Sequence, residues 1–277
     1  MFVHLKTKTI YSLLEGAIFA KALADRCSKF KMPAVGITDR ANLFGALEFS
    51  EVLAGNGIQP VIGCQLPVSA KEMDLKKLRA TDQLSMLFLA KNEVGYRNLM
   101  ELSSRFFLHN AYRFEGISIK ELDKFSDGLI CLSGGDESPI NNLLKDNKSK
   151  EAEDLLIHFK RTFGDRFYLE MNRHPSADDF IMKKNIEDNI LEIADTYSIP
   201  LVATNDVYFL DKELHQPHDA LLCVAEGSFV DQKQARRSLS IDHFFKSENE
   251  MRDLFDDIPE AIENTLEIAM RCSFRPK

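Results

Sequence analysis

Seven short apolar runs alternate with amphipathic segments along most of this chain, and the alternation restricts its fold more than any other feature. The runs cover residues 2–5, 34–38, 60–66, 85–90, 129–133, 167–171 and 201–204. Each run contains branched residues and lies close to Gly, Asp or Asn, as buried parallel strands do. Repeated strand–helix units predict a parallel sheet that either closes into a barrel or stays open.

A barrel is favoured over an open, doubly wound sheet, because no G-x-G-x-x-G follows the first run. Apolar residues make up 44% of the 277 residues, which is ample for one large core. After residue 236 the pattern changes to acidic helices, whose predicted apolar face consists of Ile258, Ile262, Leu266 and Ala269. We therefore predict an α/β fold, with a seven-stranded (β/α)7 barrel over residues 1–236 and a helical C-terminal extension over residues 237–277.

Composition excludes several classes of protein. The longest apolar runs are too short to span a membrane, and the first residues contain no basic, signal-like segment. The five cysteines are scattered without a C-x-x-C pair, which is typical of reduced thiols in the cytoplasm. A net charge of −8 argues against tight binding to nucleic acid, because phosphate contacts need clustered Lys and Arg. We expect a cytoplasmic protein with weak DNA affinity at best and no membrane contact.

Polar side chains gather where the predicted strands end, and parallel barrels carry their site residues at such ends. Lys6 and Lys8 end the first strand, and the two-residue period of a strand directs both side chains to one point. The other strand ends supply Asp39, Arg40, Gln65, Gly134, Gly135, Asn172, Arg173, His174, Asn205, Asp206 and Tyr208. Together these residues predict a polar cleft at one mouth of the barrel.

The lysine pair is unexpected in the metal-enzyme architecture that the rest of the pattern predicts. Many metallohydrolases begin with a His-x-His pair on the first strand, and Lys6 and Lys8 stand in that place. A lysine ammonium group has three donors and no lone pair to give a metal. The chain thus has the predicted framework of a metal enzyme without the metal ligands.

Longer segments resemble a known family. Residues 4–17, 32–45, 57–64, 95–99, 202–207 and 242–246 are similar to the N-terminal domain of bacterial DNA polymerase III alpha subunits. The matching segments follow one another in order from residue 2 to about residue 272. That domain is of the polymerase and histidinol phosphatase (PHP) type, so the resemblance implies a distorted seven-stranded β/α barrel.

The resemblance also implies a cluster of His, Asp, Glu and Cys that holds up to three divalent metals, and most of that cluster is missing. Its first two histidines are Lys6 and Lys8, and the histidine that follows the retained Asp39 is Arg40. The remaining positions are Glu15 for an aspartate, Gln65 for a glutamate, Ser85 for a histidine, Gly135 for a cysteine, the retained Asp206, and Tyr208 for a histidine. We therefore expect no catalytic residue, no bound metal and no cofactor in this chain.

The charges of the substituted residues predict which interactions fill such a cleft. Lys6, Lys8 and Arg40 in place of neutral imidazoles repel a metal cation. We expect them to pair instead with the acids that remain, which are Glu15, Asp39 and Asp206. Such a network would neutralise the buried charges of the cleft without a bound metal.

Histidines provide the main argument for an alternative. His174 is the one histidine at the predicted mouth, and with Asp39 and Asp206 it would form a single weak metal site. Most of the histidines on predicted helices and loops are expected to be surface or capping groups, and these histidines are His109, His158, His215, His218 and His243.

Three functions compete at this point. By resemblance, the first is a non-catalytic scaffold that docks a proofreading exonuclease subunit and stabilises the rest of a replicative polymerase alpha chain, whose magnesium-dependent nucleotidyl transfer would occur beyond residue 277. The second is a metal-dependent phosphoesterase or 3′–5′ exonuclease, which the missing ligands disfavour. The third is a separate metabolic barrel, which the matches outside the metal motifs disfavour.

Overall fold

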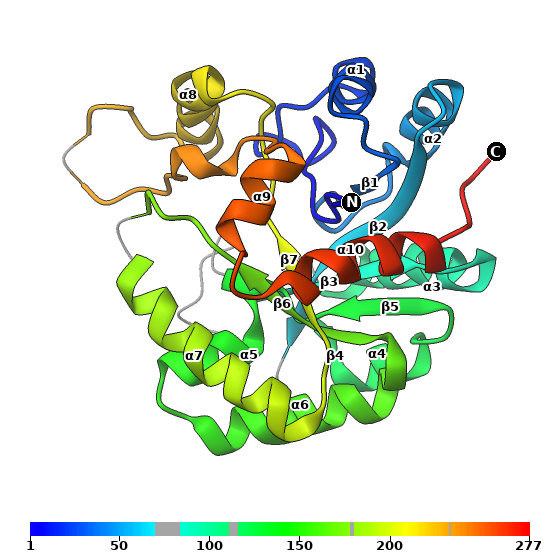
Figure 1. The fold of residues 1–277 in the computed structure, drawn as a ribbon, viewed down its shortest axis with the longest axis vertical. Coiled ribbons are helices and arrows are strands. Elements are labelled where there is room, and N and C mark those ends of the chain that lie inside the picture. Colours follow the sequence, from blue (N-terminus) through cyan, green and yellow to red (C-terminus); the bar gives the residue numbers. More distant parts are fainter. Residues whose placement is uncertain (70–83, 111–115, 178–179, 233) are drawn as a thin grey trace.

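A curled sheet covered by helices forms the centre of the computed structural model, which describes residues 1–69, 84–110, 116–177, 180–232 and 234–277 (Figure 1). The strands follow one another across the sheet in the order β1 (Ala34–Ile37), β2 (Gln59–Ser69), β3 (Ser85–Ala90), β5 (Leu129–Leu132), β6 (Phe167–Asn172) and β7 (Leu201–Thr204). The short β4 (Ile117–Ser118), which the sequence analysis does not predict, lies off this path and pairs with the end of β2.

β3 runs antiparallel to both of its neighbours, so the prediction of a wholly parallel sheet was wrong for this strand. The other strand pairs are parallel. A buried strand gives the same apolar run in either direction, and the sequence pattern therefore carries no sign of the reversal. The reversal places Ser85, the first residue of β3, opposite Pro67 near the carboxyl end of β2.

The predicted strand over residues 2–5 is not a strand of the sheet. The N-terminal segment lies instead between β1 and the chain that follows β7. On one side the amide of Gly36 donates to the carbonyl of His4 at 2.6 Å, and on the other the amide of Val207 donates to the carbonyl of Lys6 at 3.0 Å. Single hydrogen bonds and the isolated bridge between Thr7 and Val207, in place of regular ladders, close the sheet into a distorted barrel.

Inward-facing apolar side chains fill the barrel, and α10 (Pro259–Arg271) closes one end of it. Ile268 and Ala269 of this helix belong to the same buried cluster as strand residues Val61, Leu87, Leu89, Ile130, Leu132 and Val202. The amide of Val3 donates to Thr265 Oγ1 at 3.0 Å. The predicted apolar face is confirmed for Ile258, Ile262 and Ala269, which are buried, while Leu266 is partly buried.

The remaining helices surround the sheet. They are α1 (Ala20–Phe30), α2 (Ala46–Gly55), α3 (Glu93–Arg105), α4 (Ile119–Lys124), α5 (Pro139–Lys145), α6 (Ser149–Phe163), α7 (Phe180–Tyr197), α8 (His215–Glu226) and α9 (Glu248–Leu254). Single turns are η3 (Phe106–Asn110), η5 (Gly135–Glu137), η6 (Gly164–Arg166), η7 (Lys212–Leu214) and η8 (Ile241–His243). Figure 1 shows α1 and α2 on one side of the sheet and α5 to α7 on the other. Across the described part of the chain, no helix is both long and apolar enough to cross a membrane.

Local sequence explains where several helices begin. Ser118 and Ser247 each accept a hydrogen bond from the third residue of the helix that follows. The carboxylates of these third residues, Glu121 and Glu250, accept a hydrogen bond from the backbone amide of the cap. Such a reciprocal pair satisfies two backbone donors that a helix start leaves free. The second of these boxes fixes the start of α9, which lies within the predicted extension.

Candidate functional site

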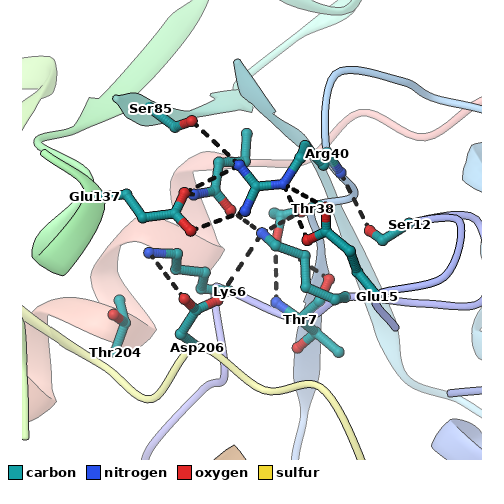
Figure 2. A network of polar contacts seen from close by, with 12 residues as sticks. Lys6, Thr7, Ser12, Glu15, Thr38, Arg40, Ser85, Glu137, Thr204 and Asp206 are labelled. Atoms are coloured by element: carbon teal, nitrogen blue, oxygen red, sulfur yellow. Dashed lines mark hydrogen bonds and ion pairs between the residues drawn. The ribbon is translucent and has the colours of Figure 1, made fainter. Parts of the chain in front are cut away.

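Charged side chains from opposite walls converge at the mouth of the barrel (Figure 2). Lys6, Lys8 and Arg40 come from the N-terminal segment and the end of β1. The carboxylates between them come from separate parts of the chain and are Glu15, Glu137, Glu170 and Asp206. The reversed β3 adds Ser85, whose hydroxyl lies 3.4 Å from Arg40 Nη1.

Lys6 is a buried ammonium with two carboxylate neighbours. Its Nζ donates to Glu170 Oε1 at 3.0 Å and lies 3.5 Å from Asp206 Oδ2, and the side chains of Lys6 and Glu170 are 1% and 0% exposed. A further hydrogen bond reaches the carbonyl of Gly134 at 3.2 Å. Burial disfavours the charge, but the carboxylates of Asp206 and Glu170 outweigh burial and hold the pKa of Lys6 above its ordinary value.

Lys8 is as buried as Lys6, but nearby carboxylates compensate its ammonium charge less well. Its Nζ donates to the carbonyl of Thr38 at 3.0 Å and to Gln65 Oε1, while Asp206 Oδ1 is 3.9 Å away. Burial lowers the pKa of Lys8 below its ordinary value, and the charge of Lys6 adds to this effect, with Asp206 opposing both. The glutamine at position 65 thus supplies an acceptor for a cation.

Asp206 is shared by both lysines. Its backbone has a positive φ of 54°, a left-handed conformation that aspartate tolerates better than most residues. Burial favours the neutral acid, but Lys6 and Lys8 hold the pKa of Asp206 well below its usual range. One carboxylate therefore neutralises part of two ammonium charges at once.

Arg40 forms the outer half of the network. Its Nη1 and Nη2 donate to Glu137 at 3.1 and 2.8 Å, and its Nε donates to Glu15 Oε2 at 3.0 Å. Gln65 Nε2 donates to Glu137 at 2.6 Å, and Arg237 Nη2 donates to Glu15 at 3.2 Å. Burial raises and Arg40 lowers the pKa of both glutamates, and the net shift is downward. Both acids are therefore ionised near neutral pH.

Asp39 does not join these ion pairs, contrary to expectation. Its carboxylate accepts hydrogen bonds from the amide of Thr9 at 2.7 Å, from Thr9 Oγ1 at 2.7 Å and from Ser12 Oγ at 2.6 Å. Burial raises the pKa of Asp39, because these neutral donors compensate the charge only in part. Hydroxyl groups near residue 10, which sequence reasoning did not consider, replace the expected cation.

Two other positions at which the resemblance implies a metal ligand, Gly135 and Tyr208, present no metal-binding group. Gly135 has φ 58°, and a Cβ at this position would lie 1.5 Å from Asn172 Oδ1, so a side chain would displace Asn172. Tyr208 is buried against the edges of His218 and His243, and burial followed by the charge of Asp206 raises the pKa of its hydroxyl.

Two of the network's carboxylates were missed from the sequence. Glu170 lies inside the apolar run 167–171, where a lone charged residue is itself a signal of a buried partner. Glu137 lies in η5, three residues after Gly134, and only the glycines of that loop were singled out. Arg237, the first residue of the predicted extension, also enters the network through Glu15.

His218 and His243 are exceptions to the expectation that most of these histidines are surface or capping groups. They are 3% and 8% exposed and hydrogen-bond the carbonyls of Glu15 and Asp206 at 2.6 and 2.8 Å. Burial lowers the pKa of both, so both are neutral near pH 7. His158 and His215 are half-buried, and the side chain of His109 lies outside the described residues.

The donors present do not fit a divalent metal. No group of three or more His, Cys, Asp or Glu that would hold a metal ion occurs in the described ranges. The Asp39 carboxylate is engaged by Thr9 and Ser12, and His174 and Asp206 alone do not make a set of three metal donors. The weak site of His174, Asp39 and Asp206 is therefore not formed, and Lys6 and Lys8 occupy the carboxylates that would bind a cation.

Comparisons with known proteins agree with this architecture. Residues 4–174 match the family described as PHP domain. DNA polymerase III subunit alpha of Caulobacter vibrioides is 45% identical over 274 residues, covering 99% of this chain and 23% of that protein. The corresponding subunit of Pseudomonas aeruginosa is 36% identical over 276 residues, covering 98% and 22%. The chain thus spans about a quarter of the length of the curated relatives it matches.

Among solved structures, a putative metal-dependent phosphoesterase from Bifidobacterium adolescentis aligns with 92% of this chain and 95% of its own, at 11% identity and a TM-score of 0.44. An amidohydrolase from Chromobacterium violaceum aligns with 75% and 88%, at 11% identity and a TM-score of 0.46. Likeness at this level carries no information about chemistry.

Proposed function

Because the chain belongs to the PHP domain family, we propose that it is the PHP domain of a replicative DNA polymerase alpha subunit and that this domain has no catalytic activity of its own. The identity to polymerase III alpha subunits over 98–99% of the chain supports the first part. Nucleotidyl transfer and its magnesium ions would belong to the part of such a subunit that this chain does not match.

The buried Lys6–Glu170 pair carries the second part of the proposal. Both side chains are fully buried and 3.0 Å apart, at the mouth where a hydrolase of this fold would activate water. A divalent ion would have to displace an ammonium group from its carboxylate, which leaves an unpaired buried charge and costs several kcal/mol. The pairs therefore favour a closed, metal-free cleft.

A structural role is what remains for such a domain. The network joins the N-terminal segment, η5, β6 and the segment after β7, and it fixes residue 237 to the loop before α1. A barrel held rigid in this way is suited to support the rest of an alpha chain and to dock the proofreading exonuclease subunit. A metal-dependent exonuclease or phosphoesterase is the rival function.

Metal content and hydrolysis test the loss of catalysis. Elemental analysis of the purified chain after dialysis is expected to find no stoichiometric zinc, manganese or iron. Assays with single-stranded DNA and a generic phosphomonoester, with manganese added, are expected to show no cleavage. Manganese-dependent cleavage that disappears in Asp206→Asn would establish the exonuclease instead.

Binding of the partner tests the scaffold role separately. Calorimetry with the cognate exonuclease subunit is expected to give a saturable complex, whereas titration with DNA is expected to give weak, salt-sensitive binding. Absence of the complex would leave the domain a passive support within its own chain, whatever the outcome of the metal assays.

A further inference from the structure

The helix α8 lies at the edge of the molecule and yet is apolar on two opposite faces. Figure 1 shows it at the periphery, with the segment that follows it looping outward. Its inner face is buried through His218, Leu222 and Cys223, and the first of these hydrogen-bonds the carbonyl of Glu15. A helix that packs on a core through one face normally carries polar residues on the other.

The outer face of α8 departs from this rule. Its apolar residues recur at the i, i+3, i+4, i+7 spacing that places side chains on one side of a helix, and they are Pro217, Ala220, Leu221 and Val224. We call these four residues the outer stripe. All are exposed except Leu221, which is half-buried, and the side chain of Val224 is 69% exposed. A helix that is apolar on both faces is normally covered on both.

The segment after α8 presents two more exposed apolar side chains, Phe229 at 73% and Val230 at 48%. The amide of Phe229 donates to Gln232 Oε1 at 3.3 Å, and the amide of Gln232 donates to the carbonyl of Phe229 at 3.2 Å. Arg236 Nη2 donates to the carbonyl of Val230 at 3.1 Å and to Asp219 of α8 at 2.6 Å. These contacts tie the segment to α8, and side chains held in place in this way lose less conformational entropy when they bind.

Negative charge borders these apolar side chains. Three acids of α8 and its flanking segments are exposed, and they are Glu213, Glu226 and Asp231. Nearby arginines are neutralised within the fold, since Arg236 pairs with Asp219 at 2.6 Å and Arg237 with Glu15 at 3.2 Å. Lys233 lies outside the described residues and offsets at most one of the three acids. The surface therefore complements a cationic partner.

We infer that the outer stripe of α8, together with Phe229 and Val230, docks a basic amphipathic helix of a partner protein. Apolar side chains at helical spacing on the partner would cover the stripe, and flanking Lys or Arg would meet the bordering acids. A second copy of this chain is a poor occupant, because two stripes bordered by acids repel each other. Docking here does not depend on whether the barrel mouth binds metal.

Fluorescence anisotropy with labelled peptides and the 277-residue chain tests the inference. The probe is a helical peptide of about 18 residues, with Leu at the i, i+3, i+4, i+7 spacing and Lys elsewhere. One counterpart replaces every Lys by Glu, and a second keeps the composition but scatters Leu around the helix. We expect saturable, micromolar binding of the probe and affinities at least about tenfold lower for both counterparts.

Substitutions locate the binding surface. Val224→Ser and Phe229→Ser are each expected to weaken binding of the probe about tenfold, while the melting temperature stays unchanged because both side chains are exposed. The matched controls are Val94→Ser on α3 and Phe44→Ser before α2, which remove the same side chains from other exposed positions and are expected to leave binding unchanged. Asp231→Asn should weaken binding less and reduce its dependence on salt.

The scattered peptide and the control variants separate a docking surface from general attraction, because a chain with net charge −8 draws polycations to its whole surface. Equal weakening by Val224→Ser and Val94→Ser would overturn the inference, as would equal binding of the probe and the scattered peptide. Absence of saturation at millimolar probe would also overturn it. Light scattering that finds a dimer which Val224→Ser dissociates would assign the stripe to a second copy of the chain instead.

Discussion

Arg40 and Glu137 form a two-pronged ion pair across the barrel mouth, with their nitrogen and oxygen atoms 3.1 and 2.8 Å apart. The arginine follows β1 and the glutamate lies in η5, 97 residues later. Planar groups that meet in this way fix each other's orientation as well as their distance. The pair therefore links distant loops of one face of the barrel.

A double-mutant cycle on this pair measures the link. Arg40→Met, Glu137→Gln and the double variant are expected to give a coupling free energy of about 1–2 kcal/mol in urea unfolding. The exposed pair Arg97–Glu93 on α3 is the control, because its side chains are 71% and 60% exposed and such pairs couple by at most about 0.5 kcal/mol. Equal coupling free energies in the two cycles would mean that solvent screens the ion pair at the barrel mouth as fully as the ion pair on the surface.

Removing the ammonium of Lys6 should be more costly still. Lys6→Met is expected to lower the free energy of unfolding by about 3–5 kcal/mol, because Glu170 is left charged and fully buried. Adding Glu170→Gln to Lys6→Met should recover much of the loss, since the glutamine still accepts hydrogen bonds without a charge. Lys29→Met on the exposed side of α1 provides the control for a lost lysine. A double variant no more stable than Lys6→Met would contradict the orphaned charge.

Acid should destabilise the fold through His4. Burial lowers the pKa of His4 to about 3, while its Nε2 hydrogen-bonds the carbonyl of Lys246 at 2.8 Å. The unfolded chain takes up this proton near pH 6.5 and the folded chain does not, so stability present above pH 6.5 is lost as pH falls toward 3. The expected loss is about 1.4 kcal/mol per pH unit below about pH 6.

The variant His4→Gln isolates this contribution. Glutamine can keep the hydrogen bond to Lys246 but cannot be protonated. Urea unfolding at pH 7.5, 6.0 and 5.0 is expected to show a shallower loss of stability in the variant than in the parent chain. Parallel curves would show that His4 takes no part in acid sensitivity.

Metal binding should return when the cations are removed together. The variant Lys6→His, Lys8→His, Arg40→His, Gln65→Glu restores neutral and anionic donors around Asp206 and Glu170. It is expected to retain about one equivalent or more of zinc through gel filtration and to melt at a higher temperature with zinc present. Adding Asp206→Asn should reduce both effects. A folded quadruple variant that remains metal-free would show that more than charge excludes the ion.

Sequence reasoning located the site better than it described the site's contacts. Lys6 and Asp206 were expected at one mouth because strand ends of a parallel barrel converge, and their charged groups lie 3.5 Å apart. The expected ion pair of Arg40 with Glu15 also forms. Asp39 was expected to pair with a cation, yet no period or motif reveals that the hydroxyls of Thr9 and Ser12 would reach it first.

Prediction of the fold from the sequence has the same limit. The alternating apolar runs predicted an α/β barrel, and most of the expected strands exist, but direction is not encoded in an apolar run. Ser85 reaches Arg40 only because β3 is reversed. The segment at residues 2–5 has the composition of a strand, while its backbone is held by single hydrogen bonds, from the amide of Gly36 to the carbonyl of His4 and from the amide of Val3 to Thr265. Such pairings depend on tertiary contacts that a local pattern does not contain.

The hydrogen bond between Val3 and Thr265 constrains the order in which parts of this protein can fold during synthesis. Their hydrogen bond spans 262 residues, so during synthesis the amide of Val3 stays without this partner until α10 has been made. Loops this long close late, and contacts between distant residues slow folding. Until α10 is synthesised, the apolar interior of the barrel is open at one end. A nascent chain at that stage is a natural client for a chaperone.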